Sequence, residues 1–155
     1  MGSPDDFNRV MSVNAKGAFF IARELQSKFT ADARVLYLTS SVGEAYKVPY
    51  PFYAISKKAL NMVYEVMKKE LKGILVAAVH PGLVKTDMYH VQVGKIPGFN
   101  ERIAIDPSIA AKFLKFILSE KVNAKEYSDE IWSIYNLHHQ PRWLEEGDEA
   151  PGQQG

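Results

Sequence analysis

The stretch Ile74-Leu75-Val76-Ala77-Ala78-Val79 is an unbroken apolar run between Gly73 and His80. A strand with one solvated face alternates polar and apolar residues, whereas a continuous run is typical of a parallel strand covered on both faces. The run ends at His80-Pro81-Gly82, where a turn is expected because proline and glycine interrupt regular structure. The stretch therefore predicts a buried parallel strand.

The segments around this run alternate between helical and strand patterns. Residues 35–39 form a second apolar run, which ends in Ser40 and Ser41, and residues 131–135 form a third. Helices are predicted from about Pro4 or Asp5 to Phe29, from about Phe52 to Lys72 and from Asp106 to about Leu118, with a long mixed loop over residues 83–105. Alternation at these lengths predicts an α/β fold, with a parallel sheet of about three strands, right-handed crossovers and flanking helices.

The first two predicted helices carry informative apolar patterns. The first has one stripe, within which Asn14 is polar: Phe7, Met11, Asn14, Ala18, Ile21 and Leu25. The second has apolar residues on two sides: Ile55, Ala59, Met62 and Val66, then Leu60, Val63, Met67 and Leu71. A helix of the second kind usually lies between a sheet and another helix, which can come from a second subunit.

The composition excludes several classes of protein. The 155 residues, 46% apolar and 24% charged, are ordinary for one soluble globular domain. The net charge of +1 gives no reason to expect nucleic acid or an acidic membrane surface, and no apolar run is long enough to span a membrane. The lack of cysteine excludes disulfides, thiolate catalysis and Cys-ligated zinc, and it fits a cytoplasmic protein.

Three side chains are expected to meet at one edge of the sheet. Ser40 follows a predicted strand, Tyr53 lies thirteen residues later, and Lys57 lies four residues after Tyr53 at the start of a helix. The carboxyl ends of parallel strands collect functional groups, and residues four apart share one face of a helix. We expect the Lys57 cation to lower the pKa of Tyr53, so that the phenol serves as a general acid or base. Ser40 would donate a hydrogen bond to a substrate oxygen as charge develops there.

The spacing Tyr-x-x-x-Lys is weak evidence by itself. It occurs again at Tyr64 and Lys68 on the same predicted helix. Tyr64 lies about 16 Å further along the helix axis than Tyr53, at 1.5 Å per residue, and no hydroxyl partner precedes it. We therefore interpret Tyr64 and Lys68 as structural residues.

Four segments, in order and at matching spacing, resemble the short-chain dehydrogenase/reductase family. They are Val13-Asn14-Ala15-Lys16-Gly17-Ala18-Phe19, Leu38-Thr39-Ser40-Ser41-Val42-Gly43, Tyr53-Ala54-Ile55-Ser56-Lys57 and His80-Pro81-Gly82-Leu83-Val84-Lys85-Thr86. The resemblance covers roughly residues 5–136, which correspond to the later part of a typical member of the family. It implies that residues 1–136 are the catalytic half of a Rossmann-like domain, and residues 137–155 are expected to form a polar, disordered tail.

The resemblance implies a role for each matching residue. Tyr53 would give its proton to a carbonyl, Ser40 would orient that carbonyl, and Lys57 would tune Tyr53 and hold the nicotinamide ribose. Asn14 would anchor a water that relays protons to Lys57. Pro81, Gly82 and Thr86 would line the nicotinamide side of NAD or NADP, and residues 83–105 would cover a small carbonyl or alcohol substrate. The two long helices would build a homo-oligomer.

Plainer interpretations remain open for several of these residues. Asn14 alone on an apolar stripe is also typical of a satisfied core group, and Thr86 can simply cap the following turn. Ser41 competes with Ser40, although Gly43, three residues after Ser40, matches the register of the family. Trp132 is interpreted as a core residue. No metal site is predicted, because His80, His138 and His139 lack partners at metal-ligand spacing.

One expected feature of the family is missing from the sequence. Members open with a Thr-Gly-x-x-x-Gly-x-Gly turn that seats the cofactor pyrophosphate at a helix N-terminus, and none of the ten glycines here forms it. We therefore expect a truncated, C-terminal portion that is weak or inactive without a nucleotide-binding half; the opening Met-Gly-Ser would then be a cloning remnant. The alternative is a non-enzymatic dimerisation or regulatory module derived from such an enzyme.

Overall fold

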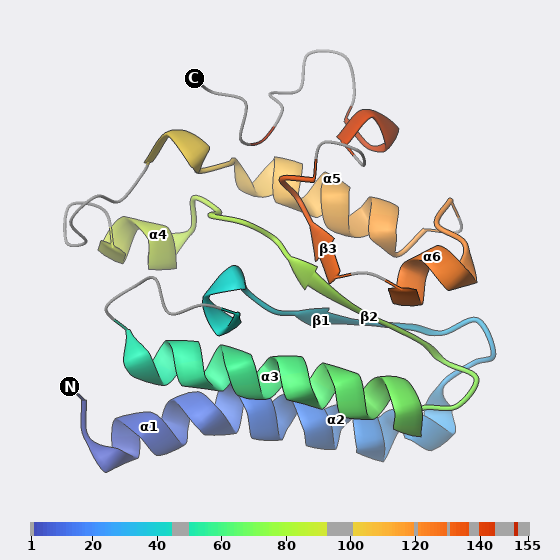
Figure 1. Ribbon diagram of the computed structural model, residues 1–155, viewed down its shortest axis with the longest axis horizontal. Helices are drawn as coiled ribbons and strands as arrows, with labels where there is room; N and C mark the ends of the chain where they lie inside the picture. Colours follow the sequence, from blue (N-terminus) through green and yellow to red (C-terminus); the bar gives the residue numbers. More distant parts are fainter. Residues whose placement is uncertain are drawn as a thin grey trace.

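The structure is a computed structural model that describes residues 2–44, 50–92, 101–119, 121–129, 131–136, 140–144 and 151. A parallel sheet lies between two layers of helices (Figure 1). Its strands are β1 (Arg34–Leu38), β2 (Leu75–His80) and β3 (Ile131–Ser133), in the order β1-β2-β3. Leu36 pairs with Ala77, and Val79 pairs with Trp132, both in parallel register. The predicted α/β fold with about three parallel strands is confirmed.

Two long helical segments form the layer below the sheet. The first consists of α1 (Pro4–Met11), a π-helical segment η1 (Ser12–Gly17), α2 (Ala18–Leu25) and a 3₁₀ turn η2 (Gln26–Lys28). Ser3 caps it, since the Ser3 hydroxyl accepts a hydrogen bond from the Asp6 N–H while the Asp6 carboxylate accepts one from the Ser3 N–H. The second segment is α3 (Pro51–Glu70), which packs against α1, η1 and α2.

The π-helical segment changes which face of the first helix is buried. The predicted stripe includes Ile21 and Leu25, but these side chains are 63% and 47% exposed, and the buried residues are Ala15 and Ala22. A π-helical turn holds an extra residue, which rotates all later positions by about 100° relative to a continuous α-helix. The downstream part of the predicted stripe is therefore wrong, because an unbroken period of 3.6 was assumed.

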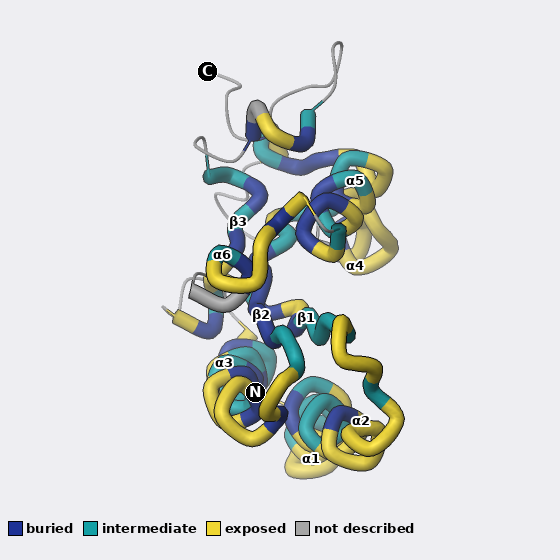
Figure 2. Tube along the Cα trace, turned by 90° about the vertical axis from the view of Figure 1, so that its right-hand side faces the viewer, coloured by how far each residue is buried: buried dark blue, intermediate teal, exposed yellow. Residues whose placement is uncertain are grey.

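Side chains of β2 point alternately into two cores. Ala77 and Val79 belong to the upper core with α5 and α6, whereas Val76 and Ala78 belong to the lower core with α2 and α3. Figure 2 shows the strand as a buried line between the two helical layers. These four residues are at most 1% exposed, so the prediction of a strand covered on both faces is confirmed.

The upper layer contains one predicted helix and several smaller elements. Helix α5 (Pro107–Ile117) begins at Asp106, whose carboxylate accepts a hydrogen bond from the Ser108 N–H at 2.8 Å, as predicted. The segment 83–105, predicted as a loop, also contains α4 (Asp87–Gln92), a 3₁₀ turn η4 (Glu101–Ile103) and a parallel bridge between Val84 and Ile105. Helix α6 (Ala124–Asp129) was not predicted, because six residues are too few to show a helical period.

Part of the C-terminal segment belongs to the core. Trp143 is 7% exposed and its ring lies 5.0 Å from that of Phe113, while the Gln140 side chain donates hydrogen bonds to the carbonyls of Ile134 and Pro151. Arg142, within the 3₁₀ turn η5 (Gln140–Arg142), forms an ion pair with Glu126 of α6. The expectation of a disordered tail over residues 137–155 therefore fails at residues 140–144, because the burial of the Trp143 ring outweighs the polar composition of the segment. Apart from Pro151, the other residues of the tail lie outside the described part of the chain.

Candidate active site

A close contact between backbones brings Ser40 to the start of α3. Ser40 follows β1 and accepts a hydrogen bond from the Val42 N–H as the 3₁₀ turn η3 (Ser41–Gly43) begins. Gly43 then lies directly on α3, where a β-carbon at this position would be 2.7 Å from the carbonyl carbon of Lys57. Only a residue without a side chain fits there. The glycine therefore allows η3 to pack on the turn of α3 that carries Tyr53 and Lys57.

The side chains of Tyr53 and Ser40 lie close enough for Ser40 to affect the titration of the Tyr53 phenol. Burial raises the pKa of the Tyr53 phenol above its usual value of 10, and Ser40 lowers it by a smaller amount. The expectation of a lowered pKa is therefore wrong for this structure, because the desolvation of the phenolate is the larger effect. Tyr53 is consequently a protonated group at neutral pH, as a proton donor to a carbonyl must be.

Lys57 lies one helical turn after Tyr53 and faces the same way. Its ammonium nitrogen is 5.6 Å from the centre of the Tyr53 ring and donates a hydrogen bond of 2.9 Å to the carbonyl oxygen of Leu38. Burial lowers the pKa of Lys57. The bond to the Leu38 carbonyl holds the Lys57 ammonium at the carboxyl end of β1.

Asn14 is connected to Tyr53 through Ser56. The Asn14 side-chain amide donates to the Ser56 hydroxyl at 2.9 Å, and that hydroxyl donates to the Tyr53 carbonyl at 2.8 Å. Ser56 is fully buried, and Asn14 lies in the π-helical segment, a type of irregularity that is frequent at functional sites. Ser56 was not predicted as a site residue; the signal available in the sequence is a serine between Tyr53 and Lys57.

The loop after β2 takes a conformation that requires glycine. Gly82 has φ +77°, and a β-carbon there would lie 2.6 Å from the hydroxyl oxygen of Tyr135. Pro81 and Gly82 thus lie at the carboxyl end of β2, the same edge of the sheet as Ser40. Tyr135 was not identified from the sequence, since nothing in its neighbourhood marks it as more than the end of a strand.

Thr86 lies further along the same loop and is exposed. Its hydroxyl is 3.4 Å from the Val84 carbonyl, and its own carbonyl accepts a hydrogen bond from the His90 N–H at the first turn of α4. Thr86 therefore lies at the start of α4, which agrees with its interpretation as a residue that caps a turn. Its side chain is exposed, so the hydroxyl is accessible. The role toward a cofactor stays a prediction.

His80 ends β2 and is nearly buried. Its Nε2 atom lies 3.7 Å from a carboxylate oxygen of Glu44, and burial lowers the pKa of the imidazole while Glu44 raises it. Within the described ranges, no group of three or more His, Cys, Asp or Glu residues is arranged to hold a metal ion.

Tyr64 and Lys68 lie in a different environment from Tyr53 and Lys57. Tyr64 is 2% exposed and belongs to the lower core, with Met67 and Leu71 as fellow members. The Lys68 ammonium is 3.5 Å from the Tyr64 hydroxyl.

The fold and this edge of the sheet define a Rossmann-like α/β protein with a serine, a tyrosine and a lysine gathered at the carboxyl ends of its strands. Residues 2–95 match the short chain dehydrogenase family. Because this match covers more than half of the 155 residues, the chain belongs to that family.

Curated relatives with similar sequences are reductases. A trihydroxynaphthalene reductase of Pestalotiopsis fici is 38% identical over 64% of this chain and 36% of its own length. An NADPH-dependent aldehyde reductase-like protein, chloroplastic, of Arabidopsis thaliana is 36% identical over 67% of this chain and 39% of its own. The chain thus spans somewhat more than a third of the length of these relatives.

Solved structures share the fold across most of the chain. The landomycin C-6 ketoreductase LanV with bound NADP and rabelomycin is 25% identical, with a TM-score of 0.68 over 85% of this chain and 52% of that one. A carbonyl reductase from chicken fatty liver, with NADPH bound, is 19% identical, with a TM-score of 0.66 over 85% of this chain and 56% of that one. The described part of the chain contains no helix with the length and hydropathy needed to cross a membrane.

Proposed function

We propose that this chain carries the catalytic half of an NAD(P)-dependent short-chain dehydrogenase/reductase, which reduces a carbonyl or oxidises the corresponding alcohol. The observation that carries the proposal is the gathering of three side chains at the carboxyl end of β1. Ser40 lies beside Tyr53, and the Lys57 ammonium lies 5.6 Å from the Tyr53 ring while it binds the Leu38 carbonyl. Family membership and the reductase relatives support the same reaction class. The absence of cysteine is compatible with the cytoplasm as its location.

Tyr53 acts as the general acid in the direction of reduction. Its phenolic proton passes to the carbonyl oxygen, the O–H bond of the product forms, and the phenolate remains. Ser40 donates a hydrogen bond to the oxygen as negative charge develops on it. Lys57 stabilises the phenolate from one helical turn away. In the direction of oxidation the phenolate takes the proton back from the alcohol.

The residues present fit the nicotinamide half of a dinucleotide. An ammonium has three donors, and the bond to Leu38 uses one of those on Lys57, so Lys57 and Tyr53 together offer donors to ribose hydroxyls. Pro81, Gly82 and the exposed Thr86 would lie along the nicotinamide ring. When bound, the dinucleotide supplies or accepts the hydride. Asn14, linked to Tyr53 through Ser56, would hold the water of the proton relay.

The pyrophosphate needs a site that these residues do not offer, since none of the ten glycines forms the required turn. We propose that a nucleotide-binding half supplies it and that its sheet continues beyond β1. Among the described strands, β1 pairs on one side only, with β2, and an open edge of this kind favours pairing with another strand. Calorimetry tests this arrangement: the chain alone should bind the dinucleotide weakly, and micromolar affinity would contradict it.

The decisive experiment reconstitutes the enzyme. The chain would be co-expressed with the nucleotide-binding half of a related reductase, and carbonyl-dependent oxidation of NADPH and NADH would be followed by absorbance. This reconstituted reductase should turn over, and Tyr53→Phe should reduce the rate by about 1000-fold, the scale of a general acid. Tyr64→Phe is the matched control and should leave the rate within about twofold of the unsubstituted protein, because its hydroxyl lies outside the site. Equal effects of the two substitutions would refute the proposal.

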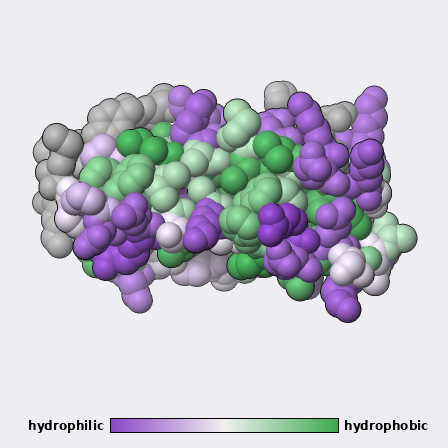
Figure 3. All heavy atoms as spheres, turned by 90° about the horizontal axis from the view of Figure 1, so that it is seen from below, coloured by the Kyte–Doolittle hydropathy of each residue, from purple (hydrophilic) through white to green (hydrophobic). Residues whose placement is uncertain are grey.

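A second candidate function is association through the outer face of the lower layer. Ile21 on α2 and Met62 on α3 are both 63% exposed, and Ile55, Val66 and Leu25 add to an apolar surface. Figure 3 shows hydrophobic residues gathered along the middle of this face, with hydrophilic residues beside them. We propose that a second copy of the chain packs there as a homo-oligomer.

Light scattering distinguishes this module from a monomeric enzyme fragment. The chain should scatter as a dimer, and Met62→Gln should shift it toward the monomer, whereas Lys69→Gln on the same helix should not. A chain that is monomeric at high concentration would exclude the association.

A further inference from the structure

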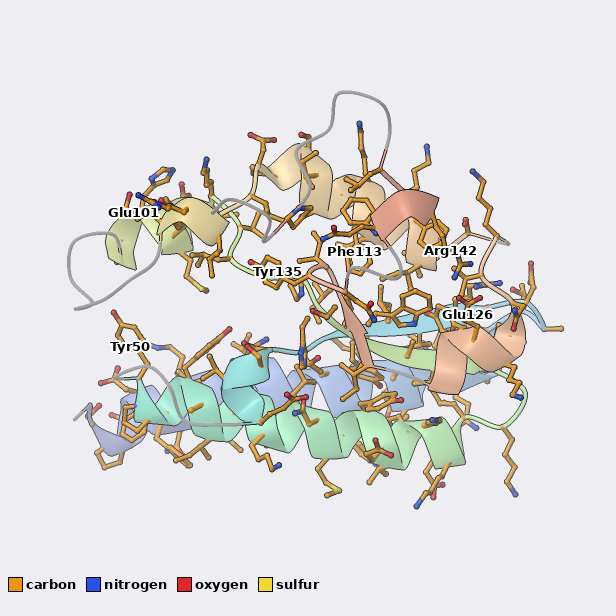
Figure 4. All side chains as sticks on the ribbon, turned by 45° about the horizontal axis from the view of Figure 1, so that its top comes forward. Tyr50, Glu101, Phe113, Glu126, Tyr135 and Arg142 are labelled. Carbon is orange, nitrogen blue, oxygen red and sulfur yellow. The ribbon has the colours of Figure 1, made fainter. Side chains whose placement is uncertain are left out.

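The Tyr135 hydroxyl joins two segments that lie far apart in the sequence. It accepts a hydrogen bond from the Leu83 N–H at 2.9 Å and donates one to the Ile103 carbonyl at 3.1 Å. Leu83 belongs to the loop after β2, and Ile103 ends η4, just before α5. Figure 4 shows Tyr135 beyond the end of β3, on the side of the molecule where Glu101 of η4 lies.

The two segments continue as a short backbone ladder. The Ile105 N–H donates to the Leu83 carbonyl at 2.9 Å, and the Lys85 N–H donates to the Ile105 carbonyl at 3.0 Å. These bonds accompany the parallel bridge between Val84 and Ile105. The ladder uses the carbonyl of Leu83 but not its N–H, and this N–H donates to the Tyr135 hydroxyl instead. Its single hydroxyl therefore fixes the start of the loop.

Gly82 and Tyr135 also fit each other sterically. A β-carbon on Gly82 would lie 2.6 Å from the Tyr135 hydroxyl oxygen and 2.8 Å from Cγ2 of Ile134. The peptide with φ +77° is thus held against the ring of Tyr135 on one side and by the Leu83 hydrogen bond on the other. Burial raises the pKa of the Tyr135 phenol, so the hydroxyl keeps the proton that it donates to Ile103.

We propose that Tyr135 is a positioning residue for the dinucleotide: it sets the path of the backbone from Pro81 to Thr86 and acts on the cofactor through that loop. The inference rests on the proposed function, which assigns Pro81, Gly82 and Thr86 to the nicotinamide side. Tyr135 itself touches neither substrate nor cofactor in this scheme. Its effect is therefore on the affinity for the dinucleotide rather than on the proton transfer at Tyr53.

A matched control separates this role from a contribution to stability alone. Tyr127 of α6 is a buried tyrosine whose hydroxyl donates a hydrogen bond of 3.1 Å to the Val35 carbonyl. Val35 lies near the start of β1, whereas the Pro81–Thr86 loop follows the end of the neighbouring parallel strand β2. Tyr127→Phe removes one phenolic hydrogen bond to a backbone carbonyl, as Tyr135→Phe does. Only Tyr135→Phe also removes the acceptor of the Leu83 N–H.

Hydrogen exchange on the chain alone tests the anchoring without any catalysis. In Tyr135→Phe, the exchange of the Leu83 amide should accelerate by at least about fivefold, as the loss of one hydrogen bond implies. In Tyr127→Phe the same amide should exchange as in the unsubstituted chain. Unchanged exchange at Leu83 in Tyr135→Phe, or equal acceleration in both variants, would overturn the proposal whether or not the chain forms an active enzyme.

Kinetics of the reconstituted reductase test the link to the cofactor. Tyr135→Phe should raise KM for the dinucleotide by about fivefold to tenfold, while kcat at saturating dinucleotide and KM for the carbonyl stay within about twofold. A fall in kcat with unchanged dinucleotide KM would overturn the positioning role. An unsubstituted reconstituted protein without turnover would instead refute the proposed function, and the exchange at Leu83 would still decide whether Tyr135 anchors the loop.

Discussion

Two turns of helix α3 carry the same pattern in different surroundings. Tyr53 and Lys57 are four residues apart, as are Tyr64 and Lys68, and the two ammonium nitrogens lie 5.6 Å and 5.7 Å from the rings of their tyrosines. The first pair meets Ser40 and the carbonyl of Leu38. The second lies eleven residues further along the helix, with Tyr64 among the apolar side chains of the lower core.

The comparison shows that the position along the sheet, and not the spacing of the two residues, makes a site. The helix rises about 16 Å between the two tyrosines, so Tyr53 lies near the carboxyl end of β1 while Tyr64 packs in the lower core beneath the sheet. Only the first turn is approached by η3, because Gly43 allows the two backbones to touch. A strand end, a glycine turn and a helix start together distinguish Tyr53.

The largest effect is expected at the contact of Gly43 with α3, which brings Ser40 to the turn that carries Tyr53 and Lys57. In Gly43→Ala the new β-carbon would lie 2.7–2.9 Å from backbone atoms of Lys57 and Lys58, so η3 must move away from α3. We expect a loss of about 1–3 kcal/mol in the free energy of unfolding, as for other overpacked sites. The displacement of Ser40 should also reduce turnover of the reconstituted reductase by at least about 100-fold.

Denaturant unfolding and steady-state kinetics measure the two effects of Gly43→Ala. The environment of Tyr64 serves as the internal control, since its side-chain resonances should keep their positions while those of Tyr53 shift. An alanine variant with native turnover would show that the close approach of η3 does not assemble the site.

Much of this arrangement could be predicted from the sequence because it depends on local signals. The continuous apolar run 74–79 gave a strand that is covered on both faces, and the capping residues Ser3 and Asp106 marked the starts of two helices correctly. The sequence also predicted that three side chains lie close together, because parallel strands end at one edge of the sheet; these are Ser40, Tyr53 and Lys57. The structure places Ser40 beside Tyr53 and the Lys57 ammonium at the Leu38 carbonyl, while the catalytic roles of the three residues stay a prediction.

The features that were missed depend on contacts between distant parts of the chain. The π-helical segment arises where Asn14 reaches Ser56 on α3, 42 positions away, and a periodicity analysis of one helix contains no trace of that bond. Tyr135 contacts Leu83, 52 positions away, for the same reason. The direction of the pKa shift of Tyr53 was wrong because the amount of burial is a property of the folded structure, whereas the neighbouring charge can be read from the spacing.

After Gly43→Ala, removal of the Ser40 hydroxyl should cause the next largest loss of turnover, because Ser40 belongs to the surroundings of Tyr53 and not of Tyr64. In Ser40→Ala we expect turnover of the reconstituted reductase to fall by about 30-fold to 100-fold, because the substrate oxygen loses a donor. The Ser40 side chain lowers the pKa of Tyr53, so the loss of its hydroxyl raises that pKa. The rate of alcohol oxidation, which requires the phenolate, should then rise with pH through a higher midpoint than in the unsubstituted enzyme.

Ser41→Ala is the control for this experiment and decides between the two serines. Ser41 is exposed in η3, and its substitution should leave both the rate and the pH midpoint unchanged within about twofold. A larger loss in Ser41→Ala than in Ser40→Ala would assign the role to Ser41.

Exchange of each lysine for methionine tests the cations of the two turns. Lys57→Met removes the donor to the Leu38 carbonyl and the positive charge beside Tyr53, and we expect the affinity of the reconstituted reductase for the dinucleotide to fall by about tenfold, the loss of one or two hydrogen bonds. Lys68→Met should leave that affinity unchanged. Equal weakening by both substitutions, measured by fluorescence titration, would mean that the overall charge of α3 is responsible.

The smallest expected effect concerns the link between the π-helical segment and Tyr53. Asn14→Ala removes a hydrogen bond of 2.9 Å to the Ser56 hydroxyl, which should cost about 1 kcal/mol in the free energy of unfolding, the usual net value for one such bond. Ser56→Ala removes the same bond together with the one to the Tyr53 carbonyl. If the two side chains act as one unit, the double substitution should cost less than the sum of the single ones by about 0.5–1 kcal/mol, as measured by denaturant unfolding. Additive losses would show that Asn14 and Ser56 stabilise α3 independently, and that the π-helical segment does not hold Tyr53 in place through Ser56.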